Sequence, residues 1–308
     1  MLGQIRHRVA RAAARIGPRI SRDNESSVAD PVVAPPQTSD YRAAGILAHI
    51  DSDGLGLEIG PSHAPIAAKA DGWNVRILDH KDQAELQKKY QGHGVDLDAI
   101  EPVDYVWSGE RYLDLVGDDR FDWIIGSHTI EHVADLVGFI NESVEILTPG
   151  GVFALVIPDL RFCFDTLRPP SDLGVVVDSH LEARKGATPG QILEYYMNFA
   201  ERGGRISWHP GDTNDLDHPV SVDDALGFYQ RALDGEELDI HVWRFTPHSF
   251  RLLIAQLRAT GLINVGEVFF SESPIGEFYI GLGLEGTDTS GLRLELSMKA
   301  KEELEGQT

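Results

Sequence analysis

Short apolar runs alternate with amphipathic stretches through most of the sequence, and this pattern predicts an α/β fold. Strands are expected, in chain order, at residues 55–60, 75–79, 103–107, 121–127 and 151–158. The stretches between these runs have room for helices, so we expect the strands to pair in parallel through right-handed crossovers. The pattern therefore predicts a mostly parallel sheet covered by helices.

Two helices are expected within this alternation. The first covers residues 41–50 and leads into the first strand. The second covers residues 131–147, and Pro149-Gly150-Gly151 ends it and turns into the next strand.

The last part of the fold is predicted from capping residues and apolar runs. A helix begins with Thr246 as N-cap and Pro247 at its first position, and ends near Gly261. Residues 263–270 and 277–284 are then expected to form a closing hairpin.

The amino-terminal segment has a different character from the rest. Residues 1–20 carry five arginines and no acidic residue, and their apolar positions recur every three or four residues, which predicts a basic amphipathic helix. Such a helix either docks on an anionic membrane surface or a partner, or packs on the acidic body of its own protein or homodimer mate. It lacks the apolar core of a signal peptide. Residues 21–39 are rich in proline and small residues, as in a flexible linker.

Charge and cysteine content narrow the functional classes. The chain has 308 residues, a net charge of −22 and no apolar run as long as the roughly 18 residues of a membrane span. An acidic protein is a poor general nucleic-acid binder, because phosphate attraction needs a basic surface. The single Cys163 cannot form an intramolecular disulfide, which favours a cytoplasmic location.

The most informative stretch is the segment GLGLEIGPSH, residues 54–63. An apolar run ends at Glu58 and passes through Gly60 into a turn, from which a helix is expected to begin at His63 or Ala64. The next apolar run ends at Asp79, 21 positions after Glu58, which is the spacing of an acid that binds a nucleoside ribose. The alternative role for Asp79 is a helix cap.

The turn itself indicates which nucleoside. Dinucleotide sites need G-x-G-x-x-G, whose glycines let the backbone approach a pyrophosphate. Here Pro61 removes a backbone donor and His63 adds bulk, so a pyrophosphate is disfavoured. A cofactor that contains a nucleoside but no phosphates remains possible, and S-adenosylmethionine is the common cofactor of this kind.

Four segments together carry a family resemblance. The order and spacing of LEIGPSHAPI, ILDH, FDWIIGSHTIEHV and LTPGGVFALVIPD resemble the motif series of class I S-adenosylmethionine-dependent methyltransferases. The sequence is most similar to bacterial methyltransferases that accompany glycosyltransferases in glycan assembly, where a strand end such as VIPDLRFCFDTLRP recurs. The turn keeps only Gly60, where the commonest family form has several glycines. The resemblance implies a Rossmann-like, mostly parallel seven-stranded sheet with one antiparallel strand.

The resemblance also implies where the cofactor would bind. Residues at the ends of four strands are expected to surround it: Glu58, Gly60, Ser62 and His63 near the methionine part, Asp79 at the ribose, Ser108, Gly109 and Glu110 at the adenine, and Ser127 and His128 beside the sulfonium. For Glu110, a solvated surface acid is the alternative interpretation.

Residues 159–241 interrupt the alternation as a long insertion after the fifth strand. Insertions at the carboxyl edge of such a sheet are often lids or binding loops. The aromatic residues Tyr195, Tyr196 and Trp208 suit stacking on sugar rings, or form the insertion's own small core.

The segment His128-Thr129-Ile130-Glu131-His132 matches H-x-x-E-H, a zinc-peptidase pattern that requires a helix. Its position directly after a strand argues against a peptidase. It is also similar to the E-x-x-E-H metal site of small-RNA 2′-O-methyltransferases and ubiquinone-pathway O-methyltransferases. That resemblance implies a divalent metal ion on His128, Glu131 and His132, completed by His209 or His241. In other methyltransferases the dipeptide Glu-His at this position begins a helix and binds no metal.

Without a metal, an alcohol acceptor needs a general base, and histidine titrates in the appropriate range. The candidates are His132 or His128, then His209 or His241, with Asp159 as the carboxylate alternative.

We therefore expect a cytoplasmic O-methyltransferase that acts on a sugar or glycan and does not bind nucleic acid. The alternatives are a methyltransferase of a lipid, quinone or natural product, and a non-catalytic binding protein with the same fold. The predicted organisation has four parts: a basic helix and linker (1–39), a cofactor-binding domain (40–158 and 242–285), an inserted substrate-binding cap (159–241) and a C-terminal tail (286–308).

Overall fold

A seven-stranded sheet forms the centre of the computed structural model, which describes residues 38–92 and 94–306. Its strands are β1 (Gly56–Ile59), β2 (Val75–Asp79), β3 (Tyr105–Val106), β4 (Phe121–Ser127), β5 (Leu147–Pro158), β8 (Gly266–Glu272) and β9 (Glu277–Gly283). Their order is β3-β2-β1-β4-β5-β9-β8, and β9 alone runs antiparallel to its two neighbours. This is the predicted fold class, with every predicted strand present.

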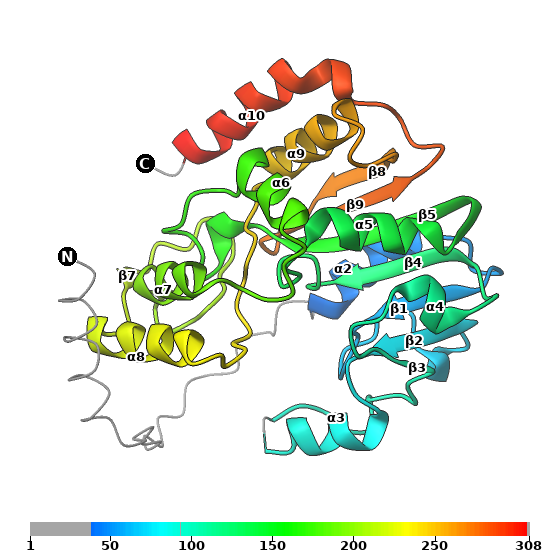
Figure 1. The fold of residues 1–308 in the computed structure, drawn as a ribbon, viewed down its shortest axis with the longest axis horizontal. Helices are drawn as coiled ribbons and strands as arrows, with labels where there is room; N and C mark the ends of the chain where they lie inside the picture. Colours follow the sequence, from blue (N-terminus) through cyan, green and yellow to red (C-terminus); the bar gives the residue numbers. More distant parts are fainter. Residues whose placement is uncertain (1–37, 93, 307–308) are drawn as a thin grey trace.

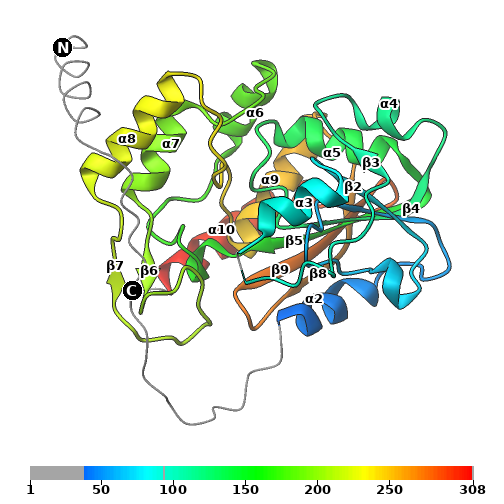
Figure 2. The same ribbon diagram turned by 90° about the horizontal axis from the view of Figure 1, so that it is seen from below.

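Both faces of the sheet are buried, as its nearly continuous apolar strands require. In β5, for example, Phe153 and Leu155 contribute to one hydrophobic core and Ala154 and Val156 to the other. The first core is covered by α4 (Tyr112–Val116), α5 (Leu136–Glu145) and α9 (Pro247–Ala259). The second is covered by α2 (Thr38–Leu47), which lies on the opposite face of the sheet from α5 (Figure 2).

The carboxyl ends of the parallel strands meet at one edge. Ile59 at the end of β1 pairs with Leu78 of β2 on one side and with Gly126 of β4 on the other. The strand order reverses between β1 and β4, and such a reversal is where open α/β sheets bind ligands. The arrowheads of β2 and β4 point toward the lobe that contains α7 and α8 (Figure 1).

That lobe belongs to the insertion after β5. It contains α6 (Leu173–Leu181), α7 (Pro189–Met197), α8 (Val222–Leu233) and a small ribbon of β6 (Glu201–Arg202) and β7 (Leu216–Asp217). The rings of Tyr196 in α7 and Phe228 in α8 stack with centroids 3.8 Å apart, so aromatic residues do form a core within the insertion. Helix α6 packs against α5 and α9.

The capping signals of α9 are confirmed. Thr246 is the N-cap and forms a capping box with Ser249, while Pro247 occupies the first turn, where its missing N–H costs nothing.

The helix expected from His63 or Ala64 is a wrong prediction. Residues 61–68 form turns, followed by the short 3-10 helix η1 (Lys69–Asp71). Pro65 lacks an N–H and disfavours a helical residue before it. The Glu58 carboxylate also accepts hydrogen bonds from the backbone N–H groups of Ile66 and Ala67, which holds the segment in a non-helical path.

Other element boundaries differ from those expected. Helix α5 begins only at Leu136, because the Asp135 side chain caps it, and β5 already begins at Leu147. The charged tail contains a 3-10 helix, η3 (Ser290–Leu292), and α10 (Arg293–Glu305), which packs along α9.

The predicted basic helix at residues 1–20 lies outside the described residues. So does most of the predicted linker, whose last residues, from Thr38, belong to α2. Within residues 38–92 and 94–306, none of the helices has the length and apolar character needed to cross a membrane.

Candidate active site

Buried polar atoms without partners gather where β1, β2 and β4 end. They are Ser62 Oγ, His63 Nδ1, Asp79 Oδ2, Thr129 Oγ1 and both carboxylate oxygens of Glu131. Buried polar groups are nearly always hydrogen-bonded, so a cluster without partners indicates a place for a polar ligand. This edge is the one that the strand order identifies as a binding site.

The turn after β1 is shaped by its backbone. Gly60 has φ +65° and Ser62 has φ +52°, both left-handed conformations. A Cβ on Gly60 would lie 3.3 Å from Thr129 Cγ2, so glycine leaves space between the turn and the segment after β4.

Glu58 supports this turn from beneath. Its carboxylate accepts hydrogen bonds from Ile66 N at 2.7 Å and Ala67 N at 3.1 Å. Burial raises the pKa of Glu58 to about 7, although these two hydrogen bonds act in the opposite direction. Because both oxygens bind backbone groups, the structure gives Glu58 a role in holding the loop.

Asp79 presents one free acceptor. Its Oδ1 accepts from His80 N at 2.7 Å and lies 2.6 Å from His80 Nδ1. Its Oδ2 is buried and has no partner. The side chain is therefore oriented by His80 while one oxygen remains available for a ligand hydroxyl.

The segment after β3 forms an exposed rim. The Glu110 carboxylate accepts from Ser108 N and Oγ, both at 2.9 Å, which closes a tight loop around Gly109. The Trp107 ring lies on this loop, with its Nε1 donating to the Glu110 carbonyl at 2.7 Å. The Trp107 ring is an aromatic surface that the sequence analysis did not identify.

His128 follows β4 directly and adopts φ +51°. Its Nε2 lies 2.8 Å from Glu277 Oε1 and its Nδ1 lies 3.4 Å from Glu131 Oε1. Burial favours the neutral ring, but hydrogen bonds with Glu131 and Glu277 outweigh it and raise the pKa of His128 to about 9. Arg42 of α2 also binds Glu277, and its Nη2 lies 3.0 Å from His128 Nε2, so His128 belongs to a cluster with Glu277 and Arg42.

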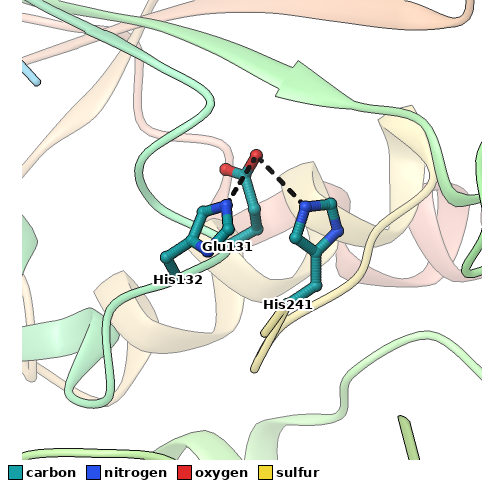
Figure 3. A group of neighbouring side chains, drawn as sticks. All are labelled: Glu131, His132 and His241. Carbon is teal, nitrogen blue, oxygen red and sulfur yellow. Dashed lines mark ion pairs between the residues drawn. The ribbon is translucent and has the colours of Figure 1, made fainter. Parts of the chain in front are cut away.

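Three side chains converge beside this cluster (Figure 3). Glu131 Oε1 lies 4.0 Å from His132 Nε2 and 3.9 Å from His241 Nε2. The remaining ring nitrogens are bound by carboxylates: His132 Nδ1 is 2.7 Å from Asp239, and His241 Nδ1 is 2.6 Å from Asp165. Burial opposes the charge of Glu131, but the three neighbouring histidines lower the pKa of its carboxyl below the ordinary value.

Backbone hydrogen bonds explain how residues so distant in sequence meet. The carbonyl of Glu131 accepts from Val242 N at 2.8 Å and from Trp243 N at 3.0 Å. The indole of Trp243 also donates to the Val133 carbonyl at 2.6 Å. The end of the insertion is thus attached to the turn that carries Glu131 and His132.

The other proposed bases lie in different surroundings. Asp159 is buried and its carboxylate is bound by Arg161, with Nε at 2.9 Å and Nη2 at 2.5 Å. Burial raises the pKa of Asp159, although Arg161 acts in the opposite direction. His209 is exposed on the loop between β6 and β7.

A cleft of about 780 Å³ lies beside these features. His80 and Trp107 line it on the sheet side, His132 and Asp135 line it near the start of α5, and Arg184 lines it on the insertion side. The cleft therefore reaches His80, next to Asp79, and His132 of the histidine cluster, whereas Asp79, Glu131 and His241 are not among its lining residues.

The structure thus brings together most of the residues predicted at the sheet edge. Residues 128–132 form turns, so they do not have the helical geometry of a zinc peptidase. Two histidines, His209 and His241, were left open to complete a metal shell, and His241 is the one that joins Glu131 and His132. The Nε2 atom of His128, the remaining predicted ligand, pairs with Glu277. Sequence reasoning assigned no role to Thr129, which lies within the segment 128–132, or to the insertion residues that line the cleft.

Comparisons with known proteins give a family match to part of the chain. Residues 57–155 match the family described as "Methyltransferase domain". Similar solved structures include the CcbJ methyltransferase from Streptomyces caelestis, with 12% identity, a TM-score of 0.42, and coverage of 81% of this chain and 96% of that one. The glycopeptide N-methyltransferase MtfA bound to S-adenosylhomocysteine is similar with 14% identity, a TM-score of 0.38, and coverage of 80% of this chain and 89% of that one. A DhpI-SAM-HEP complex is similar with 17% identity, a TM-score of 0.38, and coverage of 91% of this chain and 94% of that one. No curated protein sequence matches the chain.

The family match begins in β1 and ends within β5, so it includes the strands whose ends form the candidate site. The sheet is mostly parallel with one antiparallel strand, as the family resemblance implied. Residues 57–155 therefore resemble a methyltransferase domain, and the sheet that contains them has the class I methyltransferase arrangement.

Proposed function

We propose that this protein transfers a methyl group from S-adenosylmethionine to a hydroxyl of a sugar or glycan acceptor. The observation that carries the proposal is the set of buried, partnerless polar atoms at the switch point, which matches a nucleoside with hydroxyl, amine and carboxylate groups. The bound cofactor supplies a methyl group already activated by positive sulfur. The chain's own residues have to bind and orient the cofactor and the acceptor, and to remove the proton of the acceptor hydroxyl.

The cofactor would lie across the ends of β1, β2 and β4. Asp79 Oδ2 would accept a ribose hydroxyl, and the Trp107 ring would stack on the adenine at the cleft rim. Ser62 and Thr129, on either side of the space above Gly60, would bind the methionine part. This arrangement directs the sulfonium toward the segment that carries His128 and Glu131.

The acceptor would then be activated at Glu131, His132 and His241. The Nε2 atoms of both histidines face the Glu131 carboxylate, and His132 also lines the cleft. Because an alcohol is weakly acidic, removal of its proton is the step that these residues must assist. The oxygen then displaces the methyl carbon from sulfur in line, and positioning within the cleft favours that geometry.

The walls of the cleft support a hydroxyl-rich acceptor over a lipid or quinone. Charged residues are among its lining, namely Arg184, Lys185, Glu236 and Glu237, together with apolar side chains such as Leu238 and Val242. Sugars need this combination, because their hydroxyls require hydrogen-bond partners and their ring faces are apolar. A lipid acceptor would favour a continuous apolar lining.

The test is incubation of the full chain with S-adenosylmethionine labelled in the methyl group and saccharides extracted from cells. We expect label in saccharides, recovered as O-methyl sugars after hydrolysis, and a large loss of turnover in His132→Ala with cofactor affinity retained. Label that appears only in amines or lipids would contradict the proposed acceptor. Cofactor binding without any methylated product would favour a binding protein.

A further inference from the structure

We propose that Glu131, His132 and His241 bind a divalent transition-metal ion, and that zinc is the ion their donor set suits best. The role of this ion in activating the acceptor rests on the proposed function above. Binding of the ion does not depend on the proposed function and can be measured separately.

The geometry of the three side chains is the first support. One ligand atom from each, Oε1 of Glu131 and Nε2 of each histidine, lies within 4.8 Å of the other two. A tetrahedral site with bonds of about 2.0–2.1 Å needs ligand atoms about 3.3 Å apart. The three atoms would therefore have to approach one another by up to about 1.5 Å on binding the ion.

The carboxylate of Glu131 is the second support. It is 1% exposed, its Oε1 has His128 Nδ1 as its nearest partner at 3.4 Å, and its Oε2 has no hydrogen-bond partner. A buried ionised carboxylate with so few contacts is costly, and a cation between it and the facing imidazoles would lower that cost.

The outer ring nitrogens are the third support. Asp239 binds His132 Nδ1 and Asp165 binds His241 Nδ1, while Arg168 Nη1 holds Asp165 at 2.6 Å. A carboxylate on Nδ1 fixes the tautomer that leaves the Nε2 lone pair free, which is the usual support of a metal-bound histidine.

The donor set indicates the class of metal. Two imidazoles and one carboxylate are the protein ligands of several catalytic zinc sites, which keep a further position open. Magnesium prefers oxygen ligands and retains its water. The open position would take the acceptor hydroxyl, lower its pKa and release its proton to solvent before the oxygen attacks the methyl carbon.

A second group of three, His248, Glu272 and Glu303, provides a matched control. Glu303 already accepts from His248 N, at 3.2 and 3.1 Å, and lies 2.5 Å from His248 Nδ1, so this group is satisfied without an ion. Substitution of His248 should therefore leave metal affinity unchanged.

The experiment uses untagged full-length protein freed of metal with a chelator and titrated with zinc, manganese or magnesium chloride. Calorimetry and thermal melting report binding without any need for turnover. We expect one zinc ion per chain, weaker binding of manganese, and no saturation with magnesium. His132→Ala should lower zinc affinity by more than about 100-fold, and Asp239→Asn by about 10- to 100-fold. Asp239 is 82% exposed in its side chain, so the second variant is expected to fold even where a ligand variant fails.

Three results would overturn the inference. The first is that the wild-type protein takes up no zinc. The second is that the His132→Ala or Asp239→Asn variant binds zinc as tightly as wild type, and the third is that the His248→Ala variant loses zinc binding. Titration with S-adenosylmethionine in the presence of chelator separates this inference from the proposed function. Cofactor binding without zinc binding would refute only the metal site, whereas zinc binding without cofactor binding would refute only the methyl-transfer proposal.

Discussion

Removal of the Asp79 carboxylate tests the cofactor position most directly. The side chain is 2% exposed, with Oδ1 bound to His80 and Oδ2 unpartnered in the structure. In the proposed complex, Oδ2 accepts a ribose hydroxyl. Asp79→Ala removes that acceptor and its charge together.

The expected magnitude follows from the type of hydrogen bond. A hydrogen bond to a charged group contributes about 1.5–3 kcal/mol. Loss of about 2–3 kcal/mol corresponds to an increase of about 30- to 150-fold in the Kd for S-adenosylmethionine. Asp79→Asn keeps the volume and the contact with His80 but loses the charge, so its effect should be smaller.

Isothermal titration calorimetry with S-adenosylmethionine and S-adenosylhomocysteine provides the assay. Asp82→Ala is the matched control, because it removes the same charge three residues away, where the side chain caps α3 (Gln83–Tyr90). That control should lower thermal stability, by about 1 kcal/mol, and leave cofactor affinity unchanged. Equal affinities for wild type and folded Asp79→Ala would show that the ribose lies elsewhere.

Three further predictions concern the sheet and its edge. Because the pKa of Glu58 is raised to about 7, its contribution to the free energy of unfolding should fall by about 3 kcal/mol as pH rises from about 4.5 to 7. Urea unfolding should therefore show a shallower fall of stability with pH in the Glu58→Gln variant. The same fall in the variant and in wild type would contradict the raised pKa of Glu58. Gly56→Ala should lower Tm, since its Cβ would lie 2.1 Å from Trp123 Cη2 and overpacking costs about 1–3 kcal/mol; an unchanged Tm in calorimetry would refute this clash. Trp107→Ala should weaken cofactor binding by about 1–3 kcal/mol through lost stacking while Tm stays constant, and unaltered titrations would argue against adenine on this ring.

The sheet was predictable from sequence because its strands are buried on both faces. Runs such as residues 121–127 are apolar without alternation and end at turn residues, so both their presence and their order could be inferred. The helix expected at His63 failed because a side chain, Glu58, competes for the backbone donors of that segment. A local pattern does not reveal such competition.

The histidine cluster shows where sequence reasoning stops. His128, Glu131 and His132 were candidates as members of one motif, and both His209 and His241 remained open to complete the site. The choice depends on the hydrogen bonds from Val242 and Trp243 to the Glu131 carbonyl, which join segments about 110 positions apart. His128 lies close in sequence and in space, with Nδ1 at 3.4 Å from Glu131 Oε1, but its Nε2 is occupied by Glu277 at 2.8 Å.

The two ends of the insertion run side by side where they leave and rejoin the sheet. Leu160 N donates to the Phe245 carbonyl at 2.8 Å, and Ser171 N donates to the Arg244 carbonyl at 2.9 Å. The lobe between them is therefore a loop with a closed neck, which can be lengthened or exchanged while the neck stays in register. Replacement of the lobe would change the insertion side of the cleft, with Arg184 and Lys185, and leave the sheet edge as it is.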